Sequence, residues 1–163
     1  MTKQEFKECF DLYFSAIRKY VYYRSGDSEL ASDIAQDVFL KLWEKHLPYE
    51  VQGVKNLLYK MASDSFVSHL RKKAVHNKHE DGIKLRFELN NDARSSLMEE
   101  RKKSYTQALQ YLKEPNRSTF LMNKMEGLTH REIASRLGLS VKAVEKRVAK
   151  SVMLLKKHLN ILK

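Results

Sequence analysis

Apolar side chains near the start of the chain recur at alternating steps of four and three residues, and this spacing constrains the fold more than any other feature. The positions are Phe6, Phe10, Tyr13, Ile17 and Tyr20. Because an α-helix turns once every ~3.6 residues, the spacing places these side chains on one helix face. Residues 2–24 are therefore predicted to form an amphipathic helix, which residues 25–27 end.

The same spacing returns twice before residue 75. A second helix is predicted over residues 28–46, with Ser28 as its cap, and a third over residues 54–73, after a loop at 47–53. The expected buried positions are Ala31, Ile34, Ala35, Val38, Leu42 and Trp43, then Val54, Leu57, Leu58, Met61, Ala62, Ser65 and Leu70. Only 5 Gly and 2 Pro interrupt the chain. We therefore expect an all-α protein whose residues 1–75 form a domain of three packed helices.

Positive charge is concentrated in two blocks. The formal net charge is +11 at pH 7, of which residues 51–79 carry +5 and residues 128–163 carry +7, whereas residues 1–50 carry −2. The excess predicts two surfaces for a polyanion, either nucleic acid or an anionic membrane surface. Two solvated basic faces fit the charge alone equally well.

Cysteine content and hydropathy narrow the class of protein. The single cysteine, Cys9, excludes an internal disulfide and a Cys-based zinc site. No apolar run reaches the ~18–20 residues of a spanning helix, and the first residues lack the hydrophobic stretch of a signal peptide. We therefore expect a cytoplasmic protein without membrane insertion.

Motifs for catalysis and cofactors are lacking in the sequence. The cluster of His76, His79 and Glu80 has metal-like spacing, but it lies in a basic segment without a packed surround, and we interpret it as a solvated linker. The sequence has neither a phosphate-binding loop nor a nucleophile elbow. We expect no metal, no cofactor and no enzymatic activity.

Residues 74–96 show no sustained period, and residues 76–100 are predicted to link the first domain to a second domain at 101–163. The most specific signal of the chain lies at residues 129–150. Thr129 and Glu132 have the spacing of a capping box, Gly138 supplies the positive φ of a tight turn, and Ser140 can cap the next helix. This pattern predicts a helix-turn-helix.

The second helix of this motif has an apolar side, formed by Val141, Val144, Val148 and Val152, and a basic side. A rigid basic helix fits the major groove of DNA, although a helical hairpin with a solvated lysine face is the alternative. We expect some polar residues of the helix-turn-helix to contact DNA phosphates and others to contact base edges. The phosphate set is Thr129, Arg131, Ser140, Arg147 and Lys150, and the base-reading set is Lys142, Glu145 and Lys146.

The first domain has two further polar faces. The second helix carries Asp33, Gln36, Asp37, Leu40, Lys41 and Glu44 opposite its buried stripe. The third helix has basic residues interleaved with Tyr59 and Phe66. Aromatic rings beside cations can stack with bases freed from the duplex, but helical spacing alone fits a role in the core equally well.

These segments together resemble bacterial sigma factors. Residues 33–43 (DIAQDVFLKLW) resemble the segment that binds the RNA polymerase core enzyme, residues 57–64 and 70–73 resemble the promoter-melting segment, and residues 129–150 resemble the terminal helix-turn-helix. Their order and spacing are similar to the extracytoplasmic-function (ECF) group of the sigma-70 family, which keeps only regions 2 and 4.

The resemblance implies a non-enzymatic specificity subunit, with residues 1–75 as a region 2-like domain, 76–100 as a linker and 101–163 as a region 4-like domain. It implies that core RNA polymerase and promoter DNA are the partners, and it suggests an anti-sigma factor as another. Core polymerase would be bound by Asp33, Gln36, Asp37 and Leu40, and the −10 promoter element by Tyr59, Lys60, Asp64, Arg71, Lys72 and Lys73. The helix-turn-helix would read the −35 element.

Two positions depart from the family pattern. Leu57 stands where the family usually has an aromatic residue, and Asp64 stands where asparagine is common. The alternative to a sigma factor is a helix-turn-helix regulator of the quorum-sensing or response-regulator output type. Such a protein needs a sensor or receiver domain, and residues 1–80 lack the runs of buried β-branched residues typical of a receiver.

Overall fold

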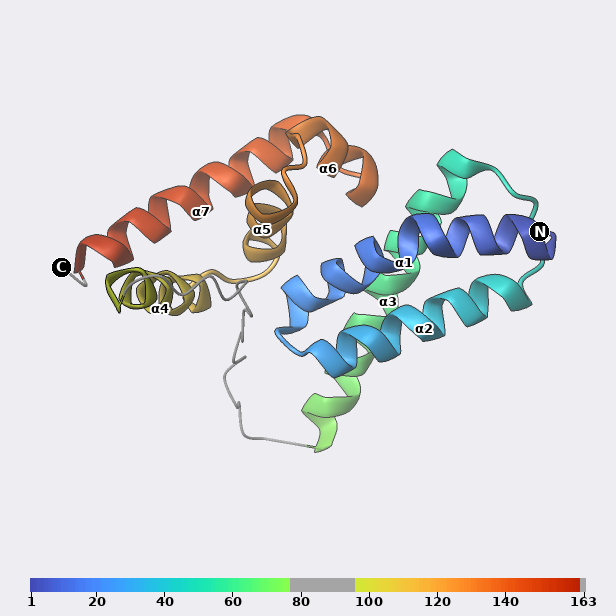
Figure 1. Cartoon of the computed structure of the whole chain (residues 1–163), viewed down its shortest axis with the longest axis horizontal. Coiled ribbons are helices and arrows are strands. Elements are labelled where there is room, and N and C mark those ends of the chain that lie inside the picture. Colours follow the sequence, from blue (N-terminus) through green and yellow to red (C-terminus); the bar gives the residue numbers. More distant parts are fainter. Residues whose placement is uncertain (77–95, 162–163) are drawn as a thin grey trace.

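The computed structural model describes residues 1–76 and 96–161. All regular structure in these two ranges is α-helical, which confirms the all-α prediction (Figure 1). The first range contains α1 (Lys3–Ser25), α2 (Ser28–Glu44) and α3 (Val51–His76). The second contains α4 (Ser96–Gln110), α5 (Asn116–Glu126), α6 (His130–Leu137) and α7 (Val141–Ile161).

The junction between α1 and α2 is built from local capping contacts. Gly26 ends α1 with a φ of 67°, a left-handed conformation that glycine adopts without steric cost. The cap of α2 is Asp27 and not Ser28, because a carboxylate oxygen of Asp27 accepts the N–H groups of Glu29 and Leu30 at 3.0 and 3.1 Å. The Ser28 hydroxyl instead accepts a hydrogen bond from Arg18.

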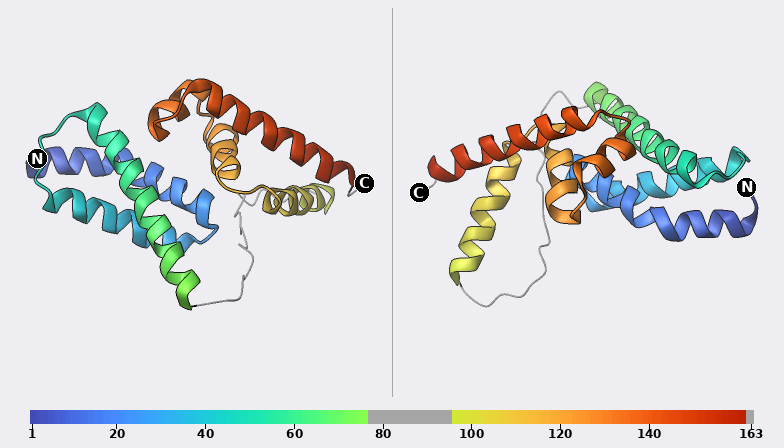
Figure 2. Two further views of the ribbon diagram at one scale, coloured as in Figure 1. Left: turned by 180° about the vertical axis from the view of Figure 1, so that it is seen from behind. Right: turned by 90° about the horizontal axis from the view of Figure 1, so that it is seen from above.

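Helices α1, α2 and α3 pack around one apolar core. α1 lies along α2, and α3 crosses both (Figures 1 and 2). The fully buried side chains include Ile17, Val21, Val38, Phe39, Leu42, Leu58, Ala62 and Phe66. Among the positions predicted to be buried, Leu70 is exposed, since the last turns of α3 project beyond α1 and α2 (Figure 1). Four others are only half-buried, namely Trp43, Leu57, Met61 and Ser65.

Helices α4 to α7 form a second packed group, in which α7 contacts α4, α5 and α6. Its buried apolar residues include Leu109, Leu112, Leu121, Met122, Ile133, Val144, Val148 and Leu155. The turns that end α5 and α6 contain Gly127 and Gly138 at φ of 65° and 66°, and the positive φ of Gly138 confirms the prediction. Val141 was expected in the core but is exposed, because it is the first residue of α7 and precedes the part that packs.

The two groups of helices contact each other directly: α1 packs against α5, and α3 packs against α6 (Figures 1 and 2). Of the predicted linker, residues 77–95 lie outside the described residues, and residues 96–100 belong to α4. That gap also includes His79 and Glu80 of the metal-like cluster. Within the described ranges, no helix is long and apolar enough to cross a membrane.

Candidate nucleic-acid and protein-binding surfaces

The helix-turn-helix is held by three contacts near helix ends. The Thr129 hydroxyl accepts the N–H of Glu132 at 3.1 Å, and the Glu132 carboxylate accepts the N–H of Thr129 at 2.8 Å. The backbone hydrogen bond from Thr129 lowers the pKa of Glu132, so the carboxylate stays charged at neutral pH. The Ser140 hydroxyl accepts the N–H of Ala143 at 3.1 Å. The predicted capping box and second cap are therefore both present.

The structure places most of the predicted DNA-contacting residues of the helix-turn-helix at the surface. Val144 and Val148 hold one side of α7 in the core, which turns the opposite side toward solvent. The exposed residues are Thr129, Arg131, Ser140, Lys142, Glu145, Lys146 and Lys150. Arg147 differs: it is half-buried and lines a pocket between the two groups of helices.

The predicted binding face of α2 is exposed as one continuous strip. Asp33, Gln36, Asp37 and Leu40 follow each other at helical spacing, and all four are exposed. Leu40 is 56% exposed, although large apolar side chains are more often buried. The strip combines one apolar side chain, Leu40, with charged and polar neighbours, a composition suited to a protein partner.

The predicted residues of α3 fall into two groups. Lys60, Asp64 and the basic run Arg71, Lys72 and Lys73 are exposed. Tyr59 and Phe66 are each only 2% exposed, so both aromatic rings belong to the packed interior in this structure. Helical spacing fits either base stacking or a place in the core for these two rings, and in this structure both lie in the core.

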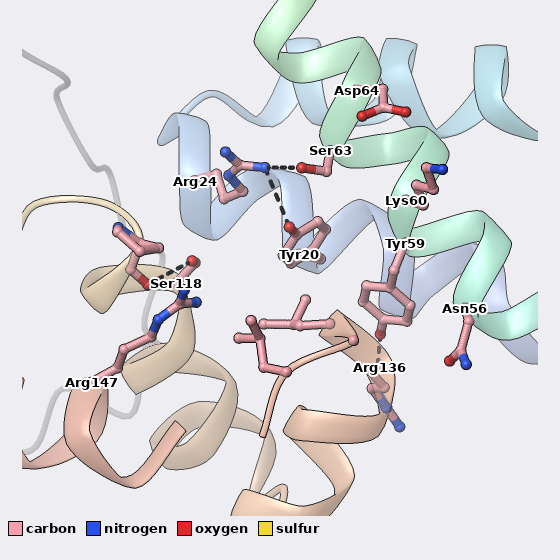
Figure 3. Close-up of a pocket in the computed structure, with 14 residues that line it drawn as sticks. Tyr20, Arg24, Asn56, Tyr59, Lys60, Ser63, Asp64, Ser118, Arg136 and Arg147 are labelled. Atoms are coloured by element: carbon pink, nitrogen blue, oxygen red, sulfur yellow. Dashed lines mark hydrogen bonds between the residues drawn. The ribbon is translucent and has the colours of Figure 1, made fainter. Parts of the chain in front are cut away.

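The hydroxyl of Tyr59 is bonded across the two helix groups. It accepts a hydrogen bond from Nη1 of Arg136 on α6 at 3.0 Å, and its ring meets the Tyr20 ring edge-on at 5.2 Å (Figure 3). Burial is the main reason that the pKa of Tyr59 is raised to about 12, so the hydroxyl remains protonated. Sequence reasoning did not identify Arg136, because the contact depends on how two separate domains pack.

A pocket of about 470 Å³ lies beside this contact. α3 contributes Lys60 and Asp64, α6 contributes Arg136, and α7 contributes Arg147 (Figure 3). Arg24 of α1 also lines it and donates hydrogen bonds to the hydroxyls of Ser63 and Tyr20. The pocket is cationic, and it contains predicted DNA-contacting residues from both halves of the chain.

Arg117, at the start of α5, is a buried residue that sequence reasoning missed. Its side chain is enclosed, with 4% exposure for the residue, and it donates hydrogen bonds to the carbonyl oxygens of Tyr23, Arg24 and Leu112 at 3.2, 2.7 and 3.1 Å. Burial lowers its pKa. Arg117 is the second residue of α5, two positions after Pro115, and nothing in this local pattern indicates the role.

The helix-turn-helix, the basic run of α3 and the α2 strip are all exposed. Comparisons with known proteins show that the chain belongs to the sigma-factor class. Residues 9–75 match the family described as Sigma-70 region 2, and residues 102–155 match Sigma-70, region 4. The chain is 30% identical over 129 residues to the ferric citrate uptake sigma factor FecI of Escherichia coli (strain K12), covering 75% of this chain and 72% of FecI.

A solved structure shares the fold. The sigma factor RpoE from Bartonella quintana, in complex with the anti-sigma factor NepR, superposes with a TM-score of 0.66 at 20% identity, covering 98% of this chain and 99% of RpoE. The chain belongs to the ECF group of the sigma-70 family. Members of this family are transcription initiation factors and not enzymes.

Proposed function

We propose that this chain binds the core RNA polymerase in the cytoplasm and directs it to promoters by reading two DNA elements. The observation that supports this most strongly is that one chain carries two basic surfaces on different helix groups together with a separate, exposed protein-binding strip. In this proposal residues 1–75 bind polymerase and the −10 element, residues 76–100 join the halves, and residues 101–163 bind the −35 element.

The polymerase-binding surface is the strip of Asp33, Gln36, Asp37 and Leu40. It faces away from the core of its own helix group, since the neighbouring Ile34 and Ala35 are buried. Interfaces commonly place an apolar contact at the centre and polar groups around it. Leu40 would be the apolar contact of this interface, with Asp33, Gln36 and Asp37 as its polar neighbours.

The −35 surface is the start of α7 with the turn before it. Lys142, Glu145 and Lys146 lie within the first two turns, where recognition helices contact base edges. Their exposure supports a base-reading role, and that of Thr129, Arg131, Ser140 and Lys150 supports phosphate contacts. Arg147 would reach phosphate only after leaving its pocket between the helix groups.

The −10 surface is the exposed side of α3. Lys60 and the run Arg71, Lys72 and Lys73 are placed to neutralise phosphates. Asp64 is also exposed, and its carboxylate can accept a hydrogen bond from an exocyclic amine of an unpaired base. Tyr59 supplies a ring for stacking, but this ring must first be uncovered.

An anti-sigma factor is the further partner in this proposal. The sigma factor RpoE from Bartonella quintana, which shares the fold, was solved in complex with the anti-sigma factor NepR. We infer a regulator of the same general kind for this chain.

In vitro transcription tests the proposal directly. Purified bacterial core polymerase should initiate at defined sites on genomic DNA of the source organism only when this chain is added. Leu40→Asp should abolish these sites, and a chain with Leu12→Asp, an exposed leucine on α1 outside the strip, should retain them. Identical start sites with and without the chain would refute the proposal.

A further inference from the structure

The pocket between the two helix groups contains more positive charge than its own side chains neutralise. Its cations come from four helices: Arg24 of α1, Lys60 of α3, Arg136 of α6 and Arg147 of α7 (Figure 3). Among the described residues that line it, Asp64 is the one carboxylate. A concave site with an excess of one charge attracts small ligands of the opposite charge. The pocket is therefore expected to attract anions.

Two of these cations are held in place by neighbouring side chains. Nη1 of Arg24 donates a hydrogen bond to the Ser63 hydroxyl at 2.8 Å, and its guanidinium lies 4.9 Å from the centre of the Phe66 ring. Nη1 of Arg136 donates to the Tyr59 hydroxyl at 3.0 Å. Side chains that are already ordered lose less conformational freedom when a ligand binds.

The other two cations, Lys60 and Arg147, have no acidic partner. Within residues 1–76 and 96–161, neither side chain forms an ion pair or donates a hydrogen bond. Arg147 is nevertheless half-buried, and partial burial of an unpaired charge is unfavourable. An anion in the pocket would compensate this cost.

Arg24 is only partly neutralised by its own ion pair. Its Nε lies 3.6 Å from the Glu114 carboxylate, but the same carboxylate pairs with Arg117 at 3.4 Å. One negative charge thus serves two guanidinium groups, and Arg24 keeps the capacity to bind a further anion. The planar guanidinium matches phosphate oxygens in geometry, so phosphate groups suit Arg24 and Arg147 better than a spherical anion does.

The size and the uncharged part of the lining favour an organic ligand over an inorganic anion. The volume of about 470 Å³ falls within the ~300–1,000 Å³ of small-molecule sites. The lining includes the polar side chains of Asn56, Ser63 and Ser118 and the apolar side chains of Pro115, Leu137 and Leu139. An inorganic anion leaves the apolar part uncovered, whereas the base of a nucleotide can pack against it.

Asp64 makes the two sides of the pocket different. Asp64 and Lys60 lie across the pocket from Arg147 (Figure 3). An ionised carboxylate only accepts hydrogen bonds and repels phosphate, so Asp64 favours a ligand end that donates. Sugar hydroxyls and the amino groups of bases are such donors. A ligand with phosphates at one end and a nucleoside at the other fits both sides.

We propose that this pocket is a binding site for a nucleoside diphosphate, whose phosphates are bound by Arg24 and Arg147 and whose nucleoside donates to Asp64. Lys60 adds a further positive charge for the phosphates. The site goes beyond the proposed role in transcription and does not depend on it. Because α1, α3, α6 and α7 all contribute residues, the ligand contacts both helix groups at once.

Isothermal titration calorimetry of the full-length chain, without polymerase or divalent cations, tests the site. The probes are ADP, GDP, adenosine and inorganic pyrophosphate, all at one ionic strength because salt screens charge interactions. ADP or GDP should bind with one molecule per chain. Pyrophosphate, which lacks the nucleoside, and adenosine, which lacks the phosphates, should each bind at least about tenfold more weakly.

Arg147→Gln removes a cation whose side chain has no ion pair within the described ranges, so it should weaken binding of the nucleotide at least about tenfold without unfolding the chain. Lys60→Gln should weaken binding in the same direction, and its exposed position keeps the test valid if Arg147→Gln is unstable. Lys156→Gln is the matched control, because Lys156 is an exposed cation of α7 outside the pocket. Circular dichroism and thermal melting without ligand verify the fold of each variant.

The proposal is overturned if neither ADP nor GDP binds the wild-type chain, or if adenosine binds as tightly as they do. It is also overturned if Arg147→Gln and Lys60→Gln lose no more affinity than Lys156→Gln. Equal affinity for pyrophosphate would rule out the nucleoside contact. A short single-stranded DNA oligonucleotide that loses affinity in Arg147→Gln, while ADP and GDP do not bind, would assign the pocket to DNA. In vitro transcription tests the proposed function separately, so the two can fail independently.

Discussion

Arg117 donates a hydrogen bond from Nη2 to the carbonyl oxygen of Arg24 at 2.7 Å, which joins the start of α5 to the end of α1. The guanidinium groups of Arg117 and Arg24 both lie beside Glu114, and two positive charges this near to each other repel. Glu114 lies between them, with one carboxylate oxygen 3.4 Å from Nε of Arg117 and the other 3.6 Å from Nε of Arg24. One carboxylate thus allows two arginines to share the boundary between the helix groups.

Arg117→Met should lower the free energy of unfolding by about 2–4 kcal/mol. The variant keeps much of the side-chain volume but leaves the carbonyls of Tyr23, Arg24 and Leu112 without their donor, and hydrogen bonds to a charged group contribute about 1.5–3 kcal/mol each. Removal of the buried guanidinium charge offsets part of this loss, because burying a charge is itself costly. Urea denaturation measures the change. Arg131→Met, on the exposed side of α6, should change stability by no more than about 0.5 kcal/mol. Equal losses in both variants would contradict this role of Arg117.

Glu126→Gln should stabilise the chain at pH 7. Burial raises the pKa of Glu126, although Lys19, Arg136 and the hydrogen bond from Tyr23 partly oppose the effect. The folded chain therefore holds this proton more tightly than the unfolded chain, so wild-type stability falls as pH rises from about 4.5, the unfolded value, through the raised folded value. Gln removes the cost of the buried charge and keeps an acceptor for Tyr23.

Thermal unfolding as a function of pH measures this effect. The Gln variant should melt at a higher temperature than wild type at pH 7, because wild type pays for the buried charge there. Its advantage should shrink toward low pH, where the wild-type carboxyl is protonated. A lower melting temperature at pH 7 would show that the ionised carboxylate stabilises the interface.

Asp37→Lys and Leu40→Asp should each weaken binding to core polymerase at least about tenfold, because a lost contact at an interface centre costs more than 1 kcal/mol. Both side chains are exposed, so the helical circular dichroism spectrum should not change. Leu12→Asp places the same charge on a leucine that is 63% exposed on α1 and should bind normally. If a pull-down shows unchanged affinity for both Asp37→Lys and Leu40→Asp, the α2 strip is not the polymerase-binding surface.

Lys146→Ala and Lys150→Ala should have different effects on DNA binding, although both residues are exposed lysines of α7. Loss of a base contact at Lys146 should reduce discrimination between promoter variants by about 1–3 kcal/mol. Loss of a phosphate contact at Lys150 should weaken all sequences alike and reduce the salt dependence. Titrations at several salt concentrations distinguish the two, and identical behaviour of the variants would show that Lys146 does not read bases.

The local structure was predictable because its causes are local in sequence. Thr129 and Glu132 stand three residues apart and cap α6 by themselves, and Gly138 takes the left-handed turn without help from other elements. The error at Ser28 arose because two adjacent residues could both cap α2. Asp27 takes that role, and the Ser28 hydroxyl is engaged by Arg18 from the neighbouring helix.

The contacts between the two halves could not be read from the sequence. Arg136 and Tyr59 are separated by 77 residues, and nothing near either one indicates its partner. Helical spacing placed Tyr59 on a face but did not show whether solvent, the core or another domain would cover it. Arg147 is likewise predicted on the DNA-facing side of α7, but it is half-buried and lines the pocket together with residues of α1 and α3 that are distant in the sequence.

Transcription start-site mapping with purified core polymerase tests the central claim, that one chain reads two promoter elements through its two halves. With wild-type chain, the mapped promoters should share two upstream sequence elements. Lys146→Ala should relax only the distal element, and Asp64→Asn should change only the base preference of the proximal one. The account is contradicted if adding the chain leaves the start sites of core polymerase unchanged, or if both substitutions alter the same element.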